Sequence, residues 1–206
     1  MTGKIIGVTG AIASGKSTVA RMLSDLGAAL ISADDIAKEL LQEDDVKTQI
    51  TCIWGSCVLA QDGEVNREAL AERVFNDSAE VQRLNAILHP PIINRIRQET
   101  ECLRRERPAR PIVLDAALLH EAGLARDCDV VIFVDAEDQR RHERAKWHRG
   151  WDRQEIARRE RLQMPVKQKK LKADYVIDNN GEIGETRARV LEFWRKAVIE
   201  NQARSS

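Results

Sequence analysis

The chain has 206 residues, of which 43% are hydrophobic and 32% are charged, and its formal net charge is zero. This composition is typical of a globular domain that can bury a core, and the charge balance argues against a nucleic-acid or membrane partner. No apolar stretch approaches the roughly 18 residues of a membrane-spanning helix. The four cysteines show neither a C-x-x-C pair nor zinc-ligand spacing, so we expect a cytoplasmic protein with reduced thiols.

The first pattern along the chain is a phosphate-binding loop. Residues 10–17 read G-x-x-x-x-G-K-S, between an apolar run at 5–9 that predicts a strand and residues 18–23, which predict a helix. The backbone N–H groups of such a loop, and the helix N-terminus after it, face phosphate oxygens. Lys16 can reach the β- and γ-phosphates, and the Ser17 hydroxyl can bind Mg²⁺. The pattern predicts binding of a purine triphosphate with Mg²⁺ by loop residues Gly10, Ala13, Ser14, Gly15, Lys16, Ser17 and Thr18.

Further apolar runs predict buried parallel strands at residues 29–32, 112–114, 130–134 and 175–177. Helical stretches separate these runs. The predicted fold class is therefore α/β, with a five-stranded parallel sheet flanked by helices. Ligands of such folds bind at the carboxyl ends of the strands.

Two aspartates follow predicted strands. Asp34 comes after the second strand, where a carboxylate can orient an acceptor hydroxyl, take its proton, or hold Mg²⁺ through water. Alternatively, Asp34 or Asp35 only caps a helix predicted over residues 36–41. Asp115 closes an apolar run, which is the usual form of the second acidic motif near Mg²⁺, and it is the candidate on the metal side.

Residues 35–110 predict a helical insertion at the mouth of the nucleotide site. Apolar residues fall at helical spacing there, with Asn66 and Ser78 as expected N-caps. His89-Pro90-Pro91 predicts the end of one helix and the start of the next. His89 itself either has a structural role or touches substrate.

A second helical insertion is predicted over residues 138–172, followed by a final helix over about 184–201. Gly150 interrupts the helix of this insertion, Asp152 with Glu155 resembles a capping box at the start of a second helix, and Met164-Pro165 predicts the end of that second helix. From residue 139 to 172 there are 13 Lys and Arg against 4 Asp and Glu. This basic block is interpreted as a lid over phosphates, as a solvated helix face, or as a nucleic-acid contact.

Arg140, Arg144 and His148 repeat at i, i+4 and i+8 and share one helix face. Guanidinium groups can neutralise the charge on a transferring phosphoryl group. The alternative is a face that only meets solvent, and we expect one or two arginines of this segment to take part in catalysis.

Several segments, in this order and spacing, resemble the dephospho-coenzyme A kinase family. The more specific ones are L-N-x-x-x-H-P at residues 84–90 and A-D-x-V-I-D-N at 173–179, and the resemblance spans about residues 4–182. It implies a P-loop kinase fold with a nucleotide-binding core (1–36, 109–137 and 173–206), a helical acceptor-binding domain (37–108) and a lid (138–172). It also implies transfer of the ATP γ-phosphate, with Mg²⁺, to the ribose 3′-hydroxyl of dephospho-coenzyme A, by a monomer or weak homo-oligomer.

The resemblance also implies roles for single residues. Lys16, Asp34 and Arg144 would be catalytic, and Ser17 with Asp115 would lie on the metal side. Asn179 and Gly181 would lie near the adenine of ATP. The acceptor would be bound by Asp34 together with Arg67, His89 and Leu118.

The chain departs from the family pattern at a few positions. The family loop usually reads G-G-I-G-S-G-K-S, whereas Ala11 and Ala13 replace two glycines here. The family's D-A-D becomes Ser32-Ala33-Asp34, which leaves the hydroxyl-side role to Asp34. His148 stands where a lid arginine is common, with Arg149 beside it, so either residue is a candidate for meeting phosphate.

Two other functions are weighed against this one. A P-loop kinase of a nucleoside or nucleoside monophosphate would use the same loop and lid, but the L-N-x-x-x-H-P stretch argues against it. A GTPase-type switch is disfavoured because the chain has no N-K-x-D motif, and Asp115-Ala116-Ala117-Leu118 stands where D-x-x-G is expected.

Overall fold

The computed structural model describes residues 2–74 and 77–200. The chain divides into two compact units. One, the sheet unit, consists of residues 1–32 and 99–206, and the other, the helical unit, consists of residues 33–98. The phosphate loop and the basic segment 139–172 both belong to the sheet unit.

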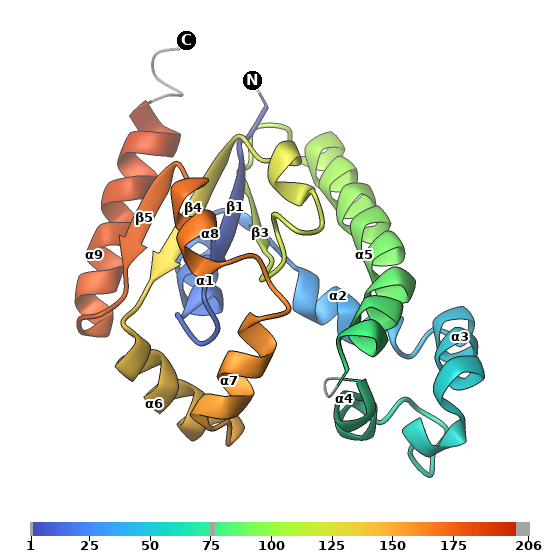
Figure 1. Cartoon of the computed structure of the whole chain (residues 1–206). Coiled ribbons are helices and arrows are strands. Elements are labelled where there is room, and N and C mark those ends of the chain that lie inside the picture. The colour runs from blue at the N-terminus through green and yellow to red at the C-terminus, as the bar shows by residue number, and fades with distance from the viewer. Residues whose placement is uncertain (1, 75–76, 201–206) are drawn as a thin grey trace. The chain divides into compact units, whose positions relative to one another are not determined.

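The sheet unit is built on one five-stranded parallel sheet with the strand order β2-β3-β1-β4-β5 (Figure 1). The strands are β1 (Ile5–Gly10), β2 (Ala29–Ser32), β3 (Ile112–Asp115), β4 (Val130–Asp135) and β5 (Tyr175–Asp178). The predicted α/β class is confirmed. All strands except β2 end one residue later than predicted, because backbone pairing continues through pairs such as Val8 with Asp115 and Asp135 with Asp178.

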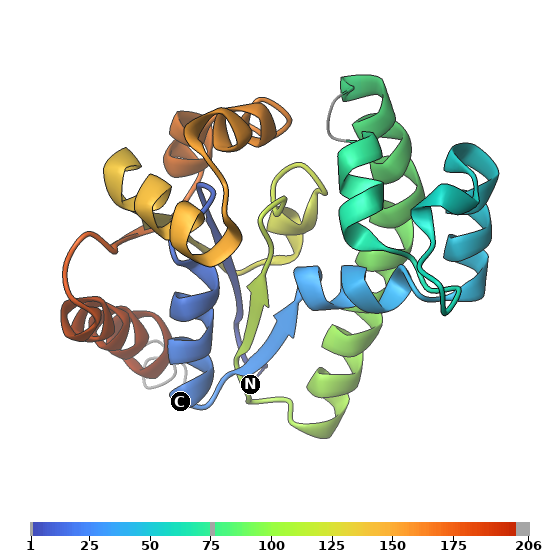
Figure 2. The ribbon, with the colours of Figure 1, turned by 90° about the horizontal axis from the view of Figure 1, so that it is seen from below.

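Helices α1 (Lys16–Asp25) and α9 (Ile183–Trp194) lie side by side on one face of the sheet (Figure 2). Each helix turns an apolar stripe inward, so that its buried side chains join those of the central strands in one core. This core includes Ile6, Val8, Val19, Leu23, Ile132, Val190, Phe193 and Trp194. The last helix continues beyond α9 as a π-helical turn over Arg195–Ile199, and its predicted end at Asn201 lies outside the described residues.

The opposite face of β1 is packed around a glycine. A Cβ added to Gly7 would lie 2.7 Å from Leu119 Cδ2 and 2.8 Å from Cys128 Sγ. Burial there raises the pKa of the Cys128 thiol to about 12. The other three cysteines are exposed thiols.

The basic segment folds as three helices, α6 (Asp138–Arg149), α7 (Arg153–Glu160) and α8 (Val166–Leu171). Gly150 ends α6 in the left-handed conformation, at φ 67°, and the Asp152 carboxylate caps α7 by accepting from Glu155 N–H at 2.8 Å. Both predictions are confirmed. The predicted end at Met164-Pro165 is wrong: α7 stops at Glu160, and Pro165 is instead the residue from which the additional helix α8 begins.

The helical unit contains α2 (Ala33–Leu40), α3 (Asp44–Trp54), a 3₁₀ turn (Ser56–Val58), α4 (Arg67–Val74) and the first part of α5 (Ser78–Glu106). Asn66 caps α4 as predicted, since its Oδ1 accepts from Glu68 and Ala69 N–H. The cap of α5 is Asp77, whose Oδ1 accepts from Ala79 N–H at 2.8 Å, and not Ser78, which is already the first residue of the helix.

The predicted break at His89-Pro90-Pro91 is also wrong, because α5 runs through both prolines. Each proline removes one hydrogen bond from the helix, a cost that predicts a kink or an end. Here Val81, Leu88 and Ile96 are all buried, so packing of the helix on both sides of the prolines outweighs the local preference. Within the described residues, no helix is long and apolar enough to cross a membrane.

The packing around Gly7 predicts a specific loss of stability. We expect Gly7→Ala to lower the free energy of unfolding by about 1–3 kcal/mol, because the new methyl group overlaps Leu119 and Cys128. Gly184→Ala, in α9, is the matched control: its Cβ meets nothing within 4 Å, and alanine is the better helix former. Urea unfolding followed by circular dichroism compares the two, and equal stabilities would contradict the packing argument.

Candidate functional site

The phosphate loop joins the buried strand β1 to helix α1. Ser14 N–H donates to Ala11 O at 3.2 Å, and Gly15 O accepts from Thr18 and Val19 N–H, each at 3.1 Å. Ala13 and Gly15 both lie in the left-handed region, with φ of 58° and 93°. The chain therefore turns sharply at these two residues before the helix begins at Lys16.

Position 10 has no room for a side chain larger than that of glycine. A Cβ there would lie 2.7 Å from both Ser14 Oγ and Val134 O. Ser14 is fully buried, and its Oγ has no hydrogen-bond partner among the described residues. A buried hydroxyl without a partner is costly, so this oxygen is suited to a polar ligand held by the loop.

Lys16 and Ser17 open α1. Lys16 Nζ reaches back along the loop and donates to Ala11 O at 3.2 Å, so the ammonium group lies over the loop backbone. Ser17 is exposed in the first helical turn. This places a cation and a hydroxyl at the positively polarised end of a helix, where the negative charge of a phosphate is stabilised.

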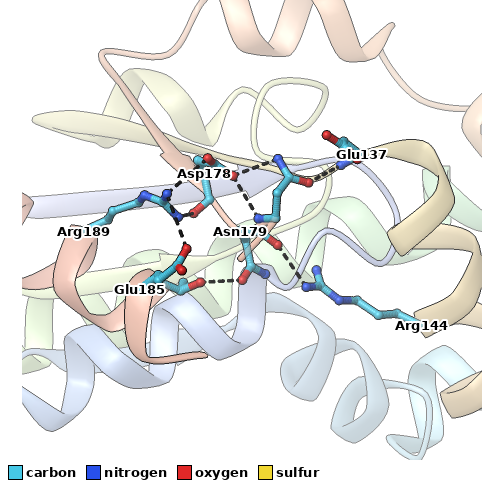
Figure 3. Close-up of polar contacts among 8 residues, drawn as sticks. Glu137, Arg144, Asp178, Asn179, Glu185 and Arg189 are labelled. Atoms are coloured by element: carbon cyan, nitrogen blue, oxygen red, sulfur yellow. Dashed lines mark hydrogen bonds and ion pairs between the residues drawn. The ribbon is translucent and has the colours of Figure 1, made fainter. Parts of the chain in front are cut away.

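Two residues far along the chain meet the Ser14 carbonyl. Asn179 Nδ2 donates to Ser14 O at 2.7 Å, and Arg144 NH1 donates to the same oxygen at 3.3 Å. Arg144 NH2 also donates to Asn179 O at 2.9 Å (Figure 3). Burial and the nearby Arg140 lower the pKa of the Arg144 guanidinium, a direction that reflects the cost of holding its charge here.

Arg141 is the most deeply buried arginine of the basic segment, at 5% exposure, and it was not among the predicted site residues. Its NH1 donates to Ile12 O at 3.1 Å and pairs with Glu160 at 2.5 Å, while NH2 pairs with Asp138 at 2.6 Å. Burial opposes its charge, but the hydrogen bonds to Asp138 and Glu160 raise its pKa overall. Arg141 thus joins the phosphate loop to both α6 and α7.

A small apolar cluster strengthens the same junction. Ile12 packs with Ala145 of α6 and Ile156 of α7, and Ala13 and Trp151 pack against this cluster. A left-handed conformation costs a non-glycine residue roughly 1–2 kcal/mol. The contacts of Ala13 with the cluster offset part of that cost.

The two predicted aspartates differ in their surroundings. Asp115 is the last residue of β3, is 8% exposed, and lies in register between Val8 of β1 and Ser32 of β2. Asp34 is exposed in the helical unit, in the first turn of α2. Because α2 begins at Ala33, three residues earlier than predicted, neither Asp34 nor Asp35 is the residue before the helix, and the capping interpretation is wrong.

The other three predicted acceptor residues lie on three separate elements. Arg67 is the exposed first residue of α4, His89 lies half-buried inside α5, and Leu118 lies half-buried in the turn after β3. Gly181 lies just before α9, where an added Cβ would overlap the Glu185 carboxylate. Among the residues that the structure describes, no group of three His, Cys, Asp or Glu side chains is arranged to hold a metal ion.

Lys169 is a second residue that the sequence did not single out. It is 1% exposed, donates to Ala117 O at 2.8 Å and Gln163 Oε1 at 3.0 Å, and pairs with Glu121 at 2.9 Å. It therefore fastens α8 to the turn that carries Leu118. Nothing in the run Lys167 to Lys172 distinguishes it from its neighbours, since only its position in the fold buries it.

A sequence model of the dephospho-CoA kinase family matches residues 4–185. The chain belongs to the dephospho-CoA kinase family. A dephospho-CoA kinase of Symbiobacterium thermophilum is 42% identical over 198 residues, which cover 94% of this chain and 81% of that protein.

Solved structures agree with this assignment. A protein from Thermus thermophilus superposes with a TM-score of 0.78 at 31% identity, covering 98% of each chain. The dephospho-CoA kinase from Campylobacter jejuni gives a TM-score of 0.70 at 25% identity, covering 96% of this chain and 98% of its own. The predicted family is confirmed.

One departure from the dephospho-CoA kinase pattern, His148 with Arg149 beside it, lies at the end of helix α6. Arg149, beside the unusual His148, has its guanidinium carbon 4.7 Å from the centre of the Trp151 ring, and Arg159 lies 4.0 Å from the same ring. These cation–π contacts engage Arg149 within the protein. His148 is exposed at the end of α6.

The burial of Arg141 predicts a large loss of stability on its removal. We expect Arg141→Met to destabilise the protein by about 3 kcal/mol or more, because Glu160 and Ile12 O lose their donor. Arg140→Met, at the exposed neighbouring position, should change the free energy of unfolding by less than about 0.5 kcal/mol. Thermal and urea unfolding measure both, and a stable Arg141→Met protein would refute this role.

Proposed function

We propose that the protein transfers the γ-phosphate of ATP to the ribose 3′-hydroxyl of dephospho-CoA. The observation that carries the proposal is the family match over residues 4–185, which includes an intact phosphate loop. The match also disfavours the nucleoside and nucleoside monophosphate kinases that the loop alone allows.

In this proposal the loop binds the phosphates of ATP. The backbone N–H groups of the loop, Lys16 Nζ and the unpartnered Ser14 Oγ are the donors for phosphate oxygens. Ser17 would bind Mg²⁺, and the buried Asp115 carboxylate at the end of β3 would lie on its metal side. When bound, Mg²⁺ supplies positive charge that neutralises the β- and γ-phosphate oxygens.

Arg144 is the proposed phosphate ligand from the lid. Its contacts with Ser14 O and Asn179 O use two of the five N–H donors of a guanidinium. The remaining donors can meet the transferring phosphoryl group while these contacts hold the side chain in place. A fixed cation at this point stabilises charge in the transition state without further reorganisation.

The helical unit is the proposed acceptor-binding part, with Arg67 and His89 as the ligands that the family resemblance implies. Asp34 would orient the 3′-hydroxyl or accept its proton. The segment from Asn179 to Gly181 would line the adenine of ATP. The division into core, acceptor domain (37–108) and lid (138–172) is likewise part of the proposal.

A coupled assay of ADP release tests the reaction. With Mg²⁺ and ATP, we expect turnover that depends on dephospho-CoA, and mass spectrometry should detect the added phosphate on the product. Adenosine and AMP are tested as alternative acceptors in separate reactions. Turnover with these acceptors but none with dephospho-CoA would overturn the proposal in favour of a nucleoside or nucleotide kinase.

The role proposed for Asp34 makes a separate prediction. If Asp34 orients or deprotonates the hydroxyl, Asp34→Asn should lower kcat by roughly 10²–10⁴-fold. As a carboxylate in the first turn of α2 it also stabilises the helix, and the loss of that charge costs about 0.3–1 kcal/mol. Steady-state kinetics and a melting curve separate the two effects, and a folded Asp34→Asn enzyme with normal kcat would exclude the catalytic role.

A further inference from the structure

The side chain of Asn179 is engaged on both of its polar atoms inside the protein. Asn179 is 5% exposed; its Nδ2 donates to Ser14 O at 2.7 Å, and its Oδ1 accepts from Thr186 Oγ1 at 2.8 Å. Thr186, in the second turn of α9, is fully buried. The Ser14 carbonyl fixes which way round the amide lies, because a carbonyl oxygen only accepts and must face the NH2 group, which leaves Oδ1 to accept from the threonine hydroxyl.

The loop that carries Asn179 is itself anchored on both sides (Figure 3). Asn179 N–H donates to Asp135 O at 2.8 Å, and Asn180 Oδ1 accepts from Glu137 N–H at 2.6 Å. On the side of α9, Arg189 donates to Asp178 O at 2.9 Å and pairs with its carboxylate at 3.4 Å. The backbone that carries the Asn179 side chain is therefore held in place from both sides.

Asn179 determines the direction of one peptide group of the phosphate loop. In a trans peptide the C=O and the N–H of the next residue point to opposite sides. With Ser14 O directed at Asn179, the N–H of Gly15 points away from Asn179. Arg141 acts in the same way two residues earlier, because its bond to Ile12 O directs the Ala13 N–H away from Arg141.

Gly15 is shaped to this contact. Its φ of 93° is rarely adopted by other residues, and an added Cβ would overlap Asn179 Nδ2. The amide thus packs directly against the Gly15 backbone. Arg144 approaches the same carbonyl from the lid at 3.3 Å, so Ser14 O receives one donor from the rigid loop and one from the lid.

We infer that Thr186 and Asn179 are a pair of positioning residues that orient the phosphate loop through the Ser14 carbonyl, and that the Asn179 side chain does not read the adenine base. The inference rests on the proposed function only in taking ATP as the nucleotide. Adenine would then contact the backbone of residues 179–181, and recognition of the base would not depend on the side-chain amide of Asn179.

The test compares a nucleotide with a base-free phosphate chain. Binding of Mg·ATP and of Mg·tripolyphosphate is measured by calorimetry without acceptor, for the wild type, Thr186→Val, Thr186→Ser and Asn179→Asp. Thr186→Val should weaken both ligands by the same factor, roughly tenfold, which corresponds to one buried hydrogen bond. Thr186→Ser keeps the hydroxyl and should bind both ligands as the wild type does.

Asn179→Asp is the second variant, used also if Thr186→Val does not fold. Its carboxylate has no donor for Ser14 O, so the loss should exceed that of Thr186→Val and again be equal for the two ligands. Ser24→Ala, which removes a hydroxyl bonded to Ala28 O at the far end of α1, is the control and should leave binding unchanged.

Three outcomes would overturn the inference. One is a loss of ATP affinity with tripolyphosphate binding intact, which would mean that the amide reads the base. Another is unchanged binding in a folded Thr186→Val or Asn179→Asp protein. The third is weaker binding that disappears when the variants are compared with the wild type at equal distances below their melting temperatures, which would make the pair merely structural. A wild type that binds ATP but does not phosphorylate dephospho-CoA would refute the proposed function alone.

Discussion

The backbone carbonyl of Ser14 is the point at which distant parts of the chain contact the phosphate loop. This oxygen lies between two left-handed residues, and it accepts hydrogen bonds from the loop after β5 and from helix α6. A loop that bends in this way has no regular hydrogen-bonding pattern of its own to hold it. Its shape must be imposed by donors from elsewhere, and these come from segments more than a hundred residues away in the chain.

The basic segment has two kinds of residue with different physical tasks. Arg141 and Lys169 are buried, each with several acceptors, and they fasten the helices of the segment to the phosphate loop and to the turn after β3. Arg144 is half-buried and donates to two backbone oxygens, those of Ser14 and Asn179. Others, such as Arg140 and Lys146, meet solvent. The basic residues of one segment thus differ in their partners: some anchor helices inside the protein and others meet solvent.

Local sequence patterns predicted secondary structure correctly where strand-forming apolar runs, glycines and helix-capping residues set the backbone conformation. The apolar runs predicted all five strands, and Gly150, Asp152 and Asn66 marked helix ends correctly. Prediction failed where packing competes with local preference. Helix α5 continues through Pro90 and Pro91 because its buried residues lie on both sides of them, and α2 starts early enough to take Asp34 into its first turn.

By itself, the sequence determined the α/β class, the phosphate loop and the family, because these depend on the order and spacing of residues along the chain. Only the tertiary structure decided which arginine is buried, which aspartate is enclosed, and which oxygen Asn179 holds. The physical reason is that what a charged or amide side chain does depends on which groups surround it and hydrogen-bond to it. Ile12 meets Arg141, and Ser14 meets Asn179, only after the sheet has brought the ends of β1, β4 and β5 together.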